Sequence, residues 1–279
     1  MVVLWGIIKH YLQRKFMKKI VIQGAIIIIV FFGTWISLTE VDWIKVFEVQ
    51  KTVNKTEQKL GELFLETFEK TENKNILIVN AIDTIVTHIC TENKIDREKI
   101  KIHVLNKDEI NAFAMPNGHL IVYSGLILNA AIQEELTGVI CHEIAHIELN
   151  HVMKKLVKEI GLTVLISMAT GNDAAEIIKE TVKMLSSSAF DRSLEKEADI
   201  KAVDYLIRAK VNPEPFANFL YKLSLEDDAK TEYLKWVSNH PASKERAEYI
   251  IEHSKNKLIK YEPILSIETW NKLKIELTE

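Results

Sequence analysis

The chain has 279 residues, enough for one well-packed domain of ordinary size with additional segments. Its formal net charge is −3, and its lysines and arginines are spread along the chain, which excludes the basic face that a nucleic-acid-binding protein needs. Only two cysteines are present, so a disulfide framework is also excluded. The apolar neighbours of Cys90 and Cys141 predict buried free thiols, with a single bridge between the two as the alternative.

The first predicted element is a membrane-spanning helix over residues 20–38. These 19 residues carry no charge. As a helix they would extend over about 28 Å, close to the hydrocarbon thickness of a bilayer. Five cations without any acid precede this segment, and acids follow it (Lys9, Arg14, Lys15, Lys18 and Lys19, then Glu40, Asp42 and Glu48). The positive-inside rule therefore predicts a basic cytoplasmic segment over residues 1–19 and an extracytoplasmic remainder.

A cleaved signal peptide is the alternative for this segment. Such a peptide normally has a shorter apolar core and ends at small residues, whereas Ser37-Leu38-Thr39 is a poor cleavage site. We therefore expect an uncleaved, single-pass anchor in the cell (inner) membrane. Residues 20–38 would contact the lipid bilayer.

Residues 41–99 predict a helical N-terminal region. Apolar residues recur there at helical spacing in two groups, which are separated by the polar residues 72–75. The groups are Leu60, Leu63, Phe64 and Phe68, then Ile78, Ile82, Ile85, Val86 and Ile89. Two amphipathic helices are expected.

A small β-sheet follows in the prediction. Residues 100–105 alternate as a strand, and residues 112–124 suggest two more strands around the turn Pro116-Asn117-Gly118. The chain after this point is predicted to be almost entirely helical, with breaks at residues 171–173, 212–213 and 240–241. The expected fold class is therefore α+β and predominantly α-helical.

The segment from His142 to His146 reads His-Glu-Ile-Ala-His and has the form H-E-x-x-H. Residues four apart share a helix face, so both imidazoles can reach one tetrahedral ion while Glu143 stands beside them as a general base. Two surface histidines are the alternative. The apolar neighbours weaken it, because imidazoles in such surroundings need a partner. The sequence predicts one Zn²⁺ ion per chain in a hydrolytic site.

Such a site needs a third protein ligand and one position open for water. The continuation H-x-x-G-x-x-H is absent, since Leu149 and Val152 stand at those positions. In the stretch SLEKEADIKA, Glu195 and Asp199 are four residues apart and share a helix face. Glu195 is the predicted metal ligand, and Asp199 is expected to accept a hydrogen bond from a ligand imidazole. For Glu195 taken alone, an exposed helix carboxylate is the alternative.

Two other histidines bear on the site. His240 starts a turn ahead of the helix that carries Arg246, and it is predicted either to stabilise the oxyanion or to cap the resting zinc. A helix-capping surface histidine is the alternative for His240. His151 lies about 180° around a continuous helix from His142, so a purely structural role is expected for it.

Together these motifs resemble the M48 metallopeptidases. H-E-x-x-H is followed about fifty residues later by Arg192-x-x-Glu195-x-Glu197-Ala198-Asp199. Two further stretches agree, namely 111–118 (NAFAMPNG) running into 121–126 (IVYSGL), and His240-Pro241 followed by Arg246. The resemblance covers residues 102 to about 250. There are two departures: Asp191 stands where relatives often have serine, and one spanning segment is present where the CAAX protease branch has several. The latter favours the single-anchor, Oma1-like quality-control branch.

The resemblance implies a zincin-like metallopeptidase domain over residues 100–255, followed by a C-terminal tail over residues 256–279. It implies a membrane-anchored endopeptidase that hydrolyses polypeptide substrates by metal-activated water, in protein quality control at the cell envelope. A proteolytically weak or inactive zinc-fold protein with a chaperone-like binding role is the alternative. The expected residues are the ligands His142, His146 and Glu195, the catalytic groups Glu143 and His240, and the supporting Asp199 and Arg246.

Residues 111–114 carry a further expectation. The strand before the Pro-Asn-Gly turn would be an edge strand, where an extended substrate can pair through its main chain. Its residues are Asn111, Ala112, Phe113 and Ala114. An ordinary hairpin that only supports the catalytic helix is the alternative.

Overall fold

The computed structural model describes residues 23–24, 26–33, 49–171, 174–225, 236, 240–241, 244–255 and 260–278. It has two compact units, Met1–Asn54 and Lys55–Glu279. In the first unit residues 26–33 are helical, and the large apolar side chains from Ile26 to Phe32 are exposed. Within the described ranges no helix combines the length and apolar character needed to cross a membrane. Residues 20–22, 25 and 34–38 of the predicted anchor, and the basic segment 1–19, lie outside these ranges.

The two predicted amphipathic helices are α3 (Val49–Glu66) and α4 (Ile76–Asn93). The short 3₁₀ turn η1 (Glu69–Thr71) lies between them. Asn75 caps the start of α4 by accepting a hydrogen bond from the Leu77 N–H, and Lys94 ends the helix in a left-handed conformation. The predicted apolar positions of both helices are buried, except Leu63, which is half-buried.

The sheet consists of the three predicted strands, β1 (Lys101–Leu105), β2 (Ala112–Met115) and β3 (His119–Tyr123). The turn η2 (Arg97–Lys99) precedes it. The strand order in the sheet is β1-β3-β2. The central strand β3 pairs in parallel with β1 and antiparallel with β2. The turn η3 (Pro116–Gly118) requires its glycine, because a Cβ on Gly118 would lie 1.8 Å from the Lys99 carbonyl oxygen and its φ is +71°. β2 forms one edge of the sheet.

Helices follow the sheet in the described residues. The predicted breaks separate α8 from α9, α10 from α11, and the His240 segment from α13. The helices are α5 (Ser124–Asn129), α6 (Gln133–Glu148), α7 (His151–Glu159), α8 (Leu162–Thr170), α9 (Ala175–Ser187), α10 (Arg192–Arg208), α11 (Glu214–Leu225), α13 (Lys244–Ser254) and α14 (Ile267–Glu276).

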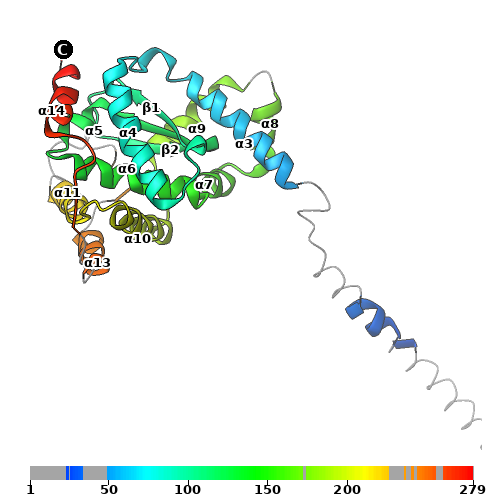
Figure 1. Cartoon of the computed structure of the whole chain (residues 1–279). Helices are drawn as coiled ribbons and strands as arrows, with labels where there is room; N and C mark the ends of the chain where they lie inside the picture. The colour runs from blue at the N-terminus through cyan, green and yellow to red at the C-terminus, as the bar shows by residue number, and fades with distance from the viewer. Residues whose placement is uncertain are drawn as a thin grey trace, which may run out of the picture. The chain divides into compact units, whose positions relative to one another are not determined.

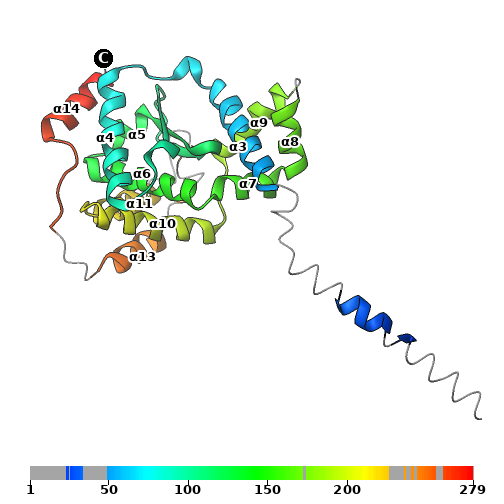
Figure 2. The same cartoon turned by 45° about the vertical axis from the view of Figure 1, so that its right-hand side comes forward.

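Helices lie on both sides of the sheet (Figures 1 and 2), and the buried side chains form two hydrophobic clusters, one on each face. On the central strand, Leu120 and Val122 join α4, α6, α10 and α11 in the first cluster, whereas Ile121 and Tyr123 join α3, α7, α8 and α9 in the second. This is the alternation that a strand buried on both faces requires. Helix α6 packs against β2 and against α10 and α11, and every side chain from Leu136 to His146 except glycine is buried there.

The C-terminal helix belongs to the same packing. α14 contacts α4, and its Trp270 and Leu273 are buried in the first cluster. The Gln133 side chain at the start of α6 exchanges two hydrogen bonds with the Leu265 main chain, at 2.8 and 2.7 Å. Cys90 and Cys141 are both buried and free, as predicted.

Candidate metal centre

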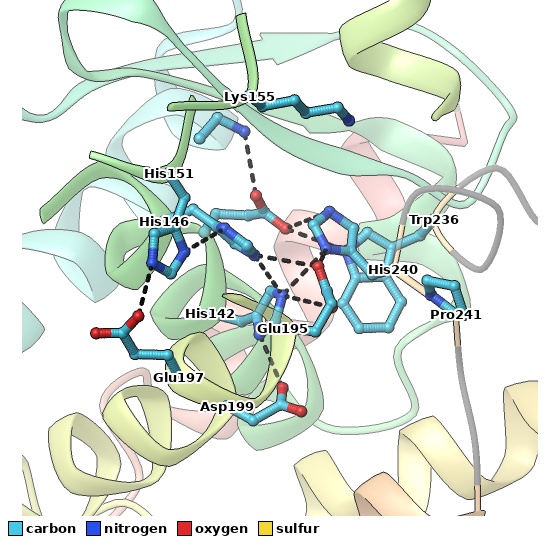
Figure 3. A network of polar contacts seen from close by, with 12 residues as sticks. His142, His146, His151, Lys155, Glu195, Glu197, Asp199, Trp236, His240 and Pro241 are labelled. Carbon is cyan, nitrogen blue, oxygen red and sulfur yellow. Dashed lines mark hydrogen bonds and ion pairs between the residues drawn. The ribbon is translucent and has the colours of Figure 1, made fainter. Parts of the chain in front are cut away.

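Four buried side chains from separate parts of the fold converge on one point (Figure 3). We call them the donor set: His142 and His146 of α6, Glu195 in the first turn of α10, and His240 ahead of α13. One ligand atom of each lies within 4.8 Å of all the others. Helical spacing places the Nε2 atoms of His142 and His146 3.0 Å apart. The predicted ligands are thus brought together.

Four further distances between donor-set atoms are close to those expected around a tetrahedral ion. Glu195 Oε2 lies 3.5 Å from His142 Nε2, and Glu195 Oε1 lies 3.4 Å from His146 Nε2. His240 Nδ1 lies 3.1 Å from His142 Nε2 and 2.8 Å from Glu195 Oε1. Bonds of about 2.0–2.1 Å in a tetrahedron separate neighbouring donors by about 3.3 Å. Three imidazoles and one carboxylate are donors that zinc accepts.

Asp199 and Arg246 lie behind this donor set. Asp199 Oδ1 is 2.9 Å from His142 Nδ1, which fixes the ring proton there and turns the Nε2 lone pair toward the centre. Arg246 donates to both carboxylate oxygens of Asp199, at 2.8 and 2.7 Å, and to the His240 carbonyl at 2.9 Å. Its Nη1 also lies 3.1 Å from Glu195 Oε2. Arg246 therefore ties α10 to the segment that carries His240.

The electrostatics of the pocket favour a bound cation. Burial would raise the pKa of Glu195, but the His240, His142 and His146 imidazoles hold that pKa well below its usual range. Burial would lower the pKa of His142, but Asp199 and Glu195 outweigh it and raise the pKa to about 9. Burial keeps the pKa of His146 well below its ordinary value, so this ring is neutral, which is the form that binds a metal. A metal cation would therefore take the place of the proton on His142 beside the buried Glu195 carboxylate.

Glu143 is fully buried next to the donor set, and both of its carboxylate oxygens are engaged. Oε2 accepts a hydrogen bond of 3.1 Å from the main-chain N–H of Ala114 in β2. Oε1 accepts one of 3.1 Å from the indole N–H of Trp236, and His240 Nε2 lies 3.3 Å from the same oxygen. The candidate base therefore connects the edge strand with the His240 segment.

Residues 79–253 match the profile of Peptidase family M48. The chain belongs to this family. Three relatives are similar over 57–61% of the chain. Metalloprotease LoiP of Escherichia coli (strain K12) is 30% identical to it, and mitochondrial metalloendopeptidase OMA1 of Bos taurus is 27% identical. The beta-barrel assembly-enhancing protease of Yersinia pestis is 24% identical. They support the Oma1-like branch. The matched part spans 64% of LoiP and 36% of each of the other two.

The predicted substrate strand of this M48 domain is at the edge of the sheet. Its Ala114 N–H points away from β3 and toward Glu143, whereas the side chains from Asn111 to Ala114 are buried. α6 and α9 pack beside β2, and Asn111 donates to the Ser186 carbonyl of α9 at 3.4 Å. Phe113 packs edge-on against Tyr123. Pairing of these residues with a substrate stays a prediction.

His151 is closer to the metal centre than its spacing from His142 predicts for one continuous helix. α6 ends at Glu148, Asn150 adopts a left-handed conformation with a φ of +56°, and α7 starts at His151. The expected position opposite the ligands assumed one continuous helix and is wrong. His151 Nδ1 lies 3.0 Å from His146 Nδ1, and its Nε2 lies 3.2 Å from Glu197. Asn150, which tolerates left-handed backbone, was the available signal.

Two aromatic rings that the motifs did not indicate cover the ligands. Phe190, between α9 and α10, stacks on His146 with ring centroids 4.2 Å apart. Trp236 stacks on His240 at 5.2 Å. The ammonium group of Lys155, on α7, lies 4.3 Å from the centroid of the Phe190 ring. Because these residues come from distant segments, no local spacing in the M48 sequence marks them.

Proposed function

We propose that this chain is a zinc-dependent metalloendopeptidase that uses the donor set and Glu143 to hydrolyse peptide bonds. The observation that carries the proposal is the fully buried Glu143 carboxylate beside three imidazoles and Glu195. A site that only stores zinc has no need of this carboxylate. Membership of family M48 supports the same reaction class.

In the proposed mechanism His142, His146 and Glu195 hold the zinc ion. When bound, the ion polarises the scissile carbonyl and lowers the pKa of water. Glu143 accepts a proton from the attacking water as the oxygen bonds to the carbonyl carbon, and it delivers that proton to the amine nitrogen as the C–N bond breaks. Asp199 and His151 orient the two ligand imidazoles from behind.

We assign His240 the role of a cap on the resting site. Its Nδ1 atom lies among the ligand atoms, 2.8 Å from Glu195 Oε1, so it occupies a direction from which water or substrate would approach. An oxyanion donor would have to leave the metal accessible instead. The donor-set geometry therefore favours the cap over the oxyanion role.

We further propose that the enzyme is anchored in the cell membrane and acts in protein quality control at the cell envelope. The uncharged segment 20–38 and the cations before it support a single-pass anchor with a cytoplasmic N-terminus. The name of the relative from Yersinia pestis, a beta-barrel assembly-enhancing protease, supports an envelope role. Misfolded or membrane-associated polypeptides outside the cytoplasm are the proposed substrates.

A cleavage assay with one variant tests the activity. The zinc-loaded chain should cut casein or a quenched peptide, lose this activity with a chelator and regain it with added zinc. Glu143→Gln should bind as much zinc as the wild type but turn over at least about 100-fold more slowly, because it has lost the base. Glu148→Gln is the matched control, since Glu148 lies on the same helix as Glu143 but is exposed and outside the donor set.

The outcomes separate the two functions. A wild-type chain that binds zinc yet cleaves nothing would favour the chaperone-like alternative. Cleavage by Glu143→Gln at the wild-type rate would remove Glu143 from the mechanism.

A further inference from the structure

Trp236 is not a metal ligand, yet its side chain contacts several residues of the metal centre. Its side chain is completely buried, and its indole N–H donates to Glu143 Oε1 at 3.1 Å. Its ring lies beside His240 (Figure 3) and stacks on it with an interplanar angle of 27°. The Arg246 guanidinium lies 5.6 Å from the centroid of the Trp236 ring. One side chain thus holds both the proposed base and the proposed cap.

The main chain of Trp236 makes two more links. Its N–H donates to the Ile110 carbonyl just ahead of β2 at 3.0 Å, and its carbonyl accepts from the His240 N–H at 2.8 Å. Trp236 is therefore fastened to the edge-strand side of the site as well as to the cap. Packing alone would accept phenylalanine here, and only the hydrogen bond to Glu143 uses the indole nitrogen.

The described arrangement has to change before the reaction can proceed. Glu143 has one oxygen bonded to Ala114 and the other to Trp236, and His240 Nε2 lies 3.3 Å from the second oxygen, so a water molecule that gives its proton to Glu143 needs the space that His240 occupies. His240 occupies a ligand direction at the same time. We call this arrangement the closed form, and the form in which His240 has left the donor set the open form.

We propose that Trp236 is a positioning residue that stabilises the closed form by holding Glu143 and His240 together. This inference rests on the zinc site of the proposed function and adds a control on it. A hydrogen bond to a buried carboxylate contributes enough that its loss changes an equilibrium by about tenfold or more. Losing the indole N–H should shift the population toward the open form by that factor.

Zinc release is the decisive measurement because it does not depend on peptide cleavage. The closed form has four donors and the open form three, so the rate at which a chromogenic chelator removes zinc should follow the open fraction. Trp236→Phe keeps an aromatic face for His240 but lacks the N–H. We expect it to lose zinc about tenfold faster than the wild type. With a peptide substrate its KM should fall with little change in kcat, because the closed form competes with the substrate.

A double variant shows whether the effect passes through His240. In a His240→Ala background the cap is already gone, so Trp236→Phe should add little to zinc release or to KM. Trp270→Phe is the control for replacing a buried tryptophan, since Trp270 lies in α14 against α4. Its zinc release should equal that of the wild type. Trp236→Leu, which also lacks the N–H, supplies the measurement if the phenylalanine variant does not fold.

The inference is overturned if zinc release from Trp236→Phe is as slow as from the wild type. It is also overturned if Trp236→Phe accelerates zinc release in the His240→Ala background by the same factor as in the wild-type background. A chain that binds zinc but hydrolyses nothing defeats the proposed function, whereas the release assay still decides the role of Trp236. A chain that binds no zinc overturns both.

Discussion

Glu195 and Glu197 are two residues apart on α10, yet they face different surroundings. Glu195 is 4% exposed and lies within 3.5 Å of both His142 and His146, whereas the Glu197 side chain is 52% exposed and contacts only His151 among the metal-centre residues. Buried carboxylates keep their charge only when positive groups or a metal balance it. Of the two carboxylates, Glu195 is therefore the one placed to be the proposed zinc ligand.

Metal content should report this difference. Glu195→Ala removes a donor and should weaken zinc affinity by more than about 100-fold, beyond the usual effect of losing an outer partner. Glu197→Ala should leave the zinc content nearly unchanged. Dialysis against a competing chelator followed by metal analysis gives both values. Equal zinc occupancy in the wild type and Glu195→Ala would mean that another residue is the third ligand.

His240 offers a kinetic test of the cap. If His240 caps the resting site, His240→Ala should raise kcat/KM, mainly through a lower KM. The reason is that the substrate no longer competes with His240 for the metal. If it donates to the developing oxyanion instead, kcat should fall by about 10²–10³-fold at constant KM. Steady-state kinetics of this one variant distinguish the roles. No change in either constant would leave His240 with only its contacts to Arg246 and Trp236.

The sequence predicted which candidate ligands the fold brings together, because their pattern is local. His142 and His146 must share a face of any helix that contains them, and Glu195 and Asp199 do so on another. Trp236 and Phe190 could not be predicted in this way. Their contacts depend on how separate segments pack, and no spacing in the chain encodes that.

At the scale of elements, the central strand carries a buried histidine that should make stability depend on pH. His119 is 4% exposed, and its Nδ1 lies 2.9 Å from His103 Nε2 of β1. Burial, with smaller effects from His103 and Lys101, lowers the pKa of His119 to about 4. The unfolded chain would titrate near 6.5, so it binds more protons than the folded chain between these values.

Stability should therefore fall as the pH falls from about 6.5 toward 4. For His119 alone the free energy of unfolding should be about 2 kcal/mol lower at pH 5 than at pH 7. His119→Gln should reduce this dependence, which urea unfolding at the two pH values would measure. Between pH 7 and 8 the free energy of unfolding should change equally in the wild type and in His119→Gln. An unaltered dependence in His119→Gln would exclude His119 as its source.

The sequence predicted the type of most elements and the hairpin of β2 and β3, but not the place of β1 in the sheet. The apolar periodicity of α3 and α4 and the alternation of β1 are properties of single segments. The order β1-β3-β2 and the parallel pairing of β1 with β3 depend on contacts across the chain. The break at Asn150 also escaped prediction, because the helical pattern continues on both sides of one left-handed residue.

At the scale of the whole molecule, the second unit accounts for the site and the first for the proposed anchor. Every member of the donor set belongs to Lys55–Glu279, where α14 closes the packing against α4. Residues 1–54 therefore supply none of the donor-set side chains. What those residues would supply is a location, and through it access to one pool of polypeptides.

That location can be tested by topology. Five cations and no acid precede residues 20–38. Because cations are retained on the cytoplasmic side, a periplasmic-type reporter fused after residue 50 should be active only outside the cytoplasm. The same reporter fused after residue 19 should be inactive, which controls for export without an anchor. Replacing the five cations by glutamine should weaken the orientation and lower the activity of the first fusion. Cytoplasmic activity of a reporter after residue 50 would contradict both the orientation and the proposed substrate pool, while leaving the chemistry of the metal centre unaffected.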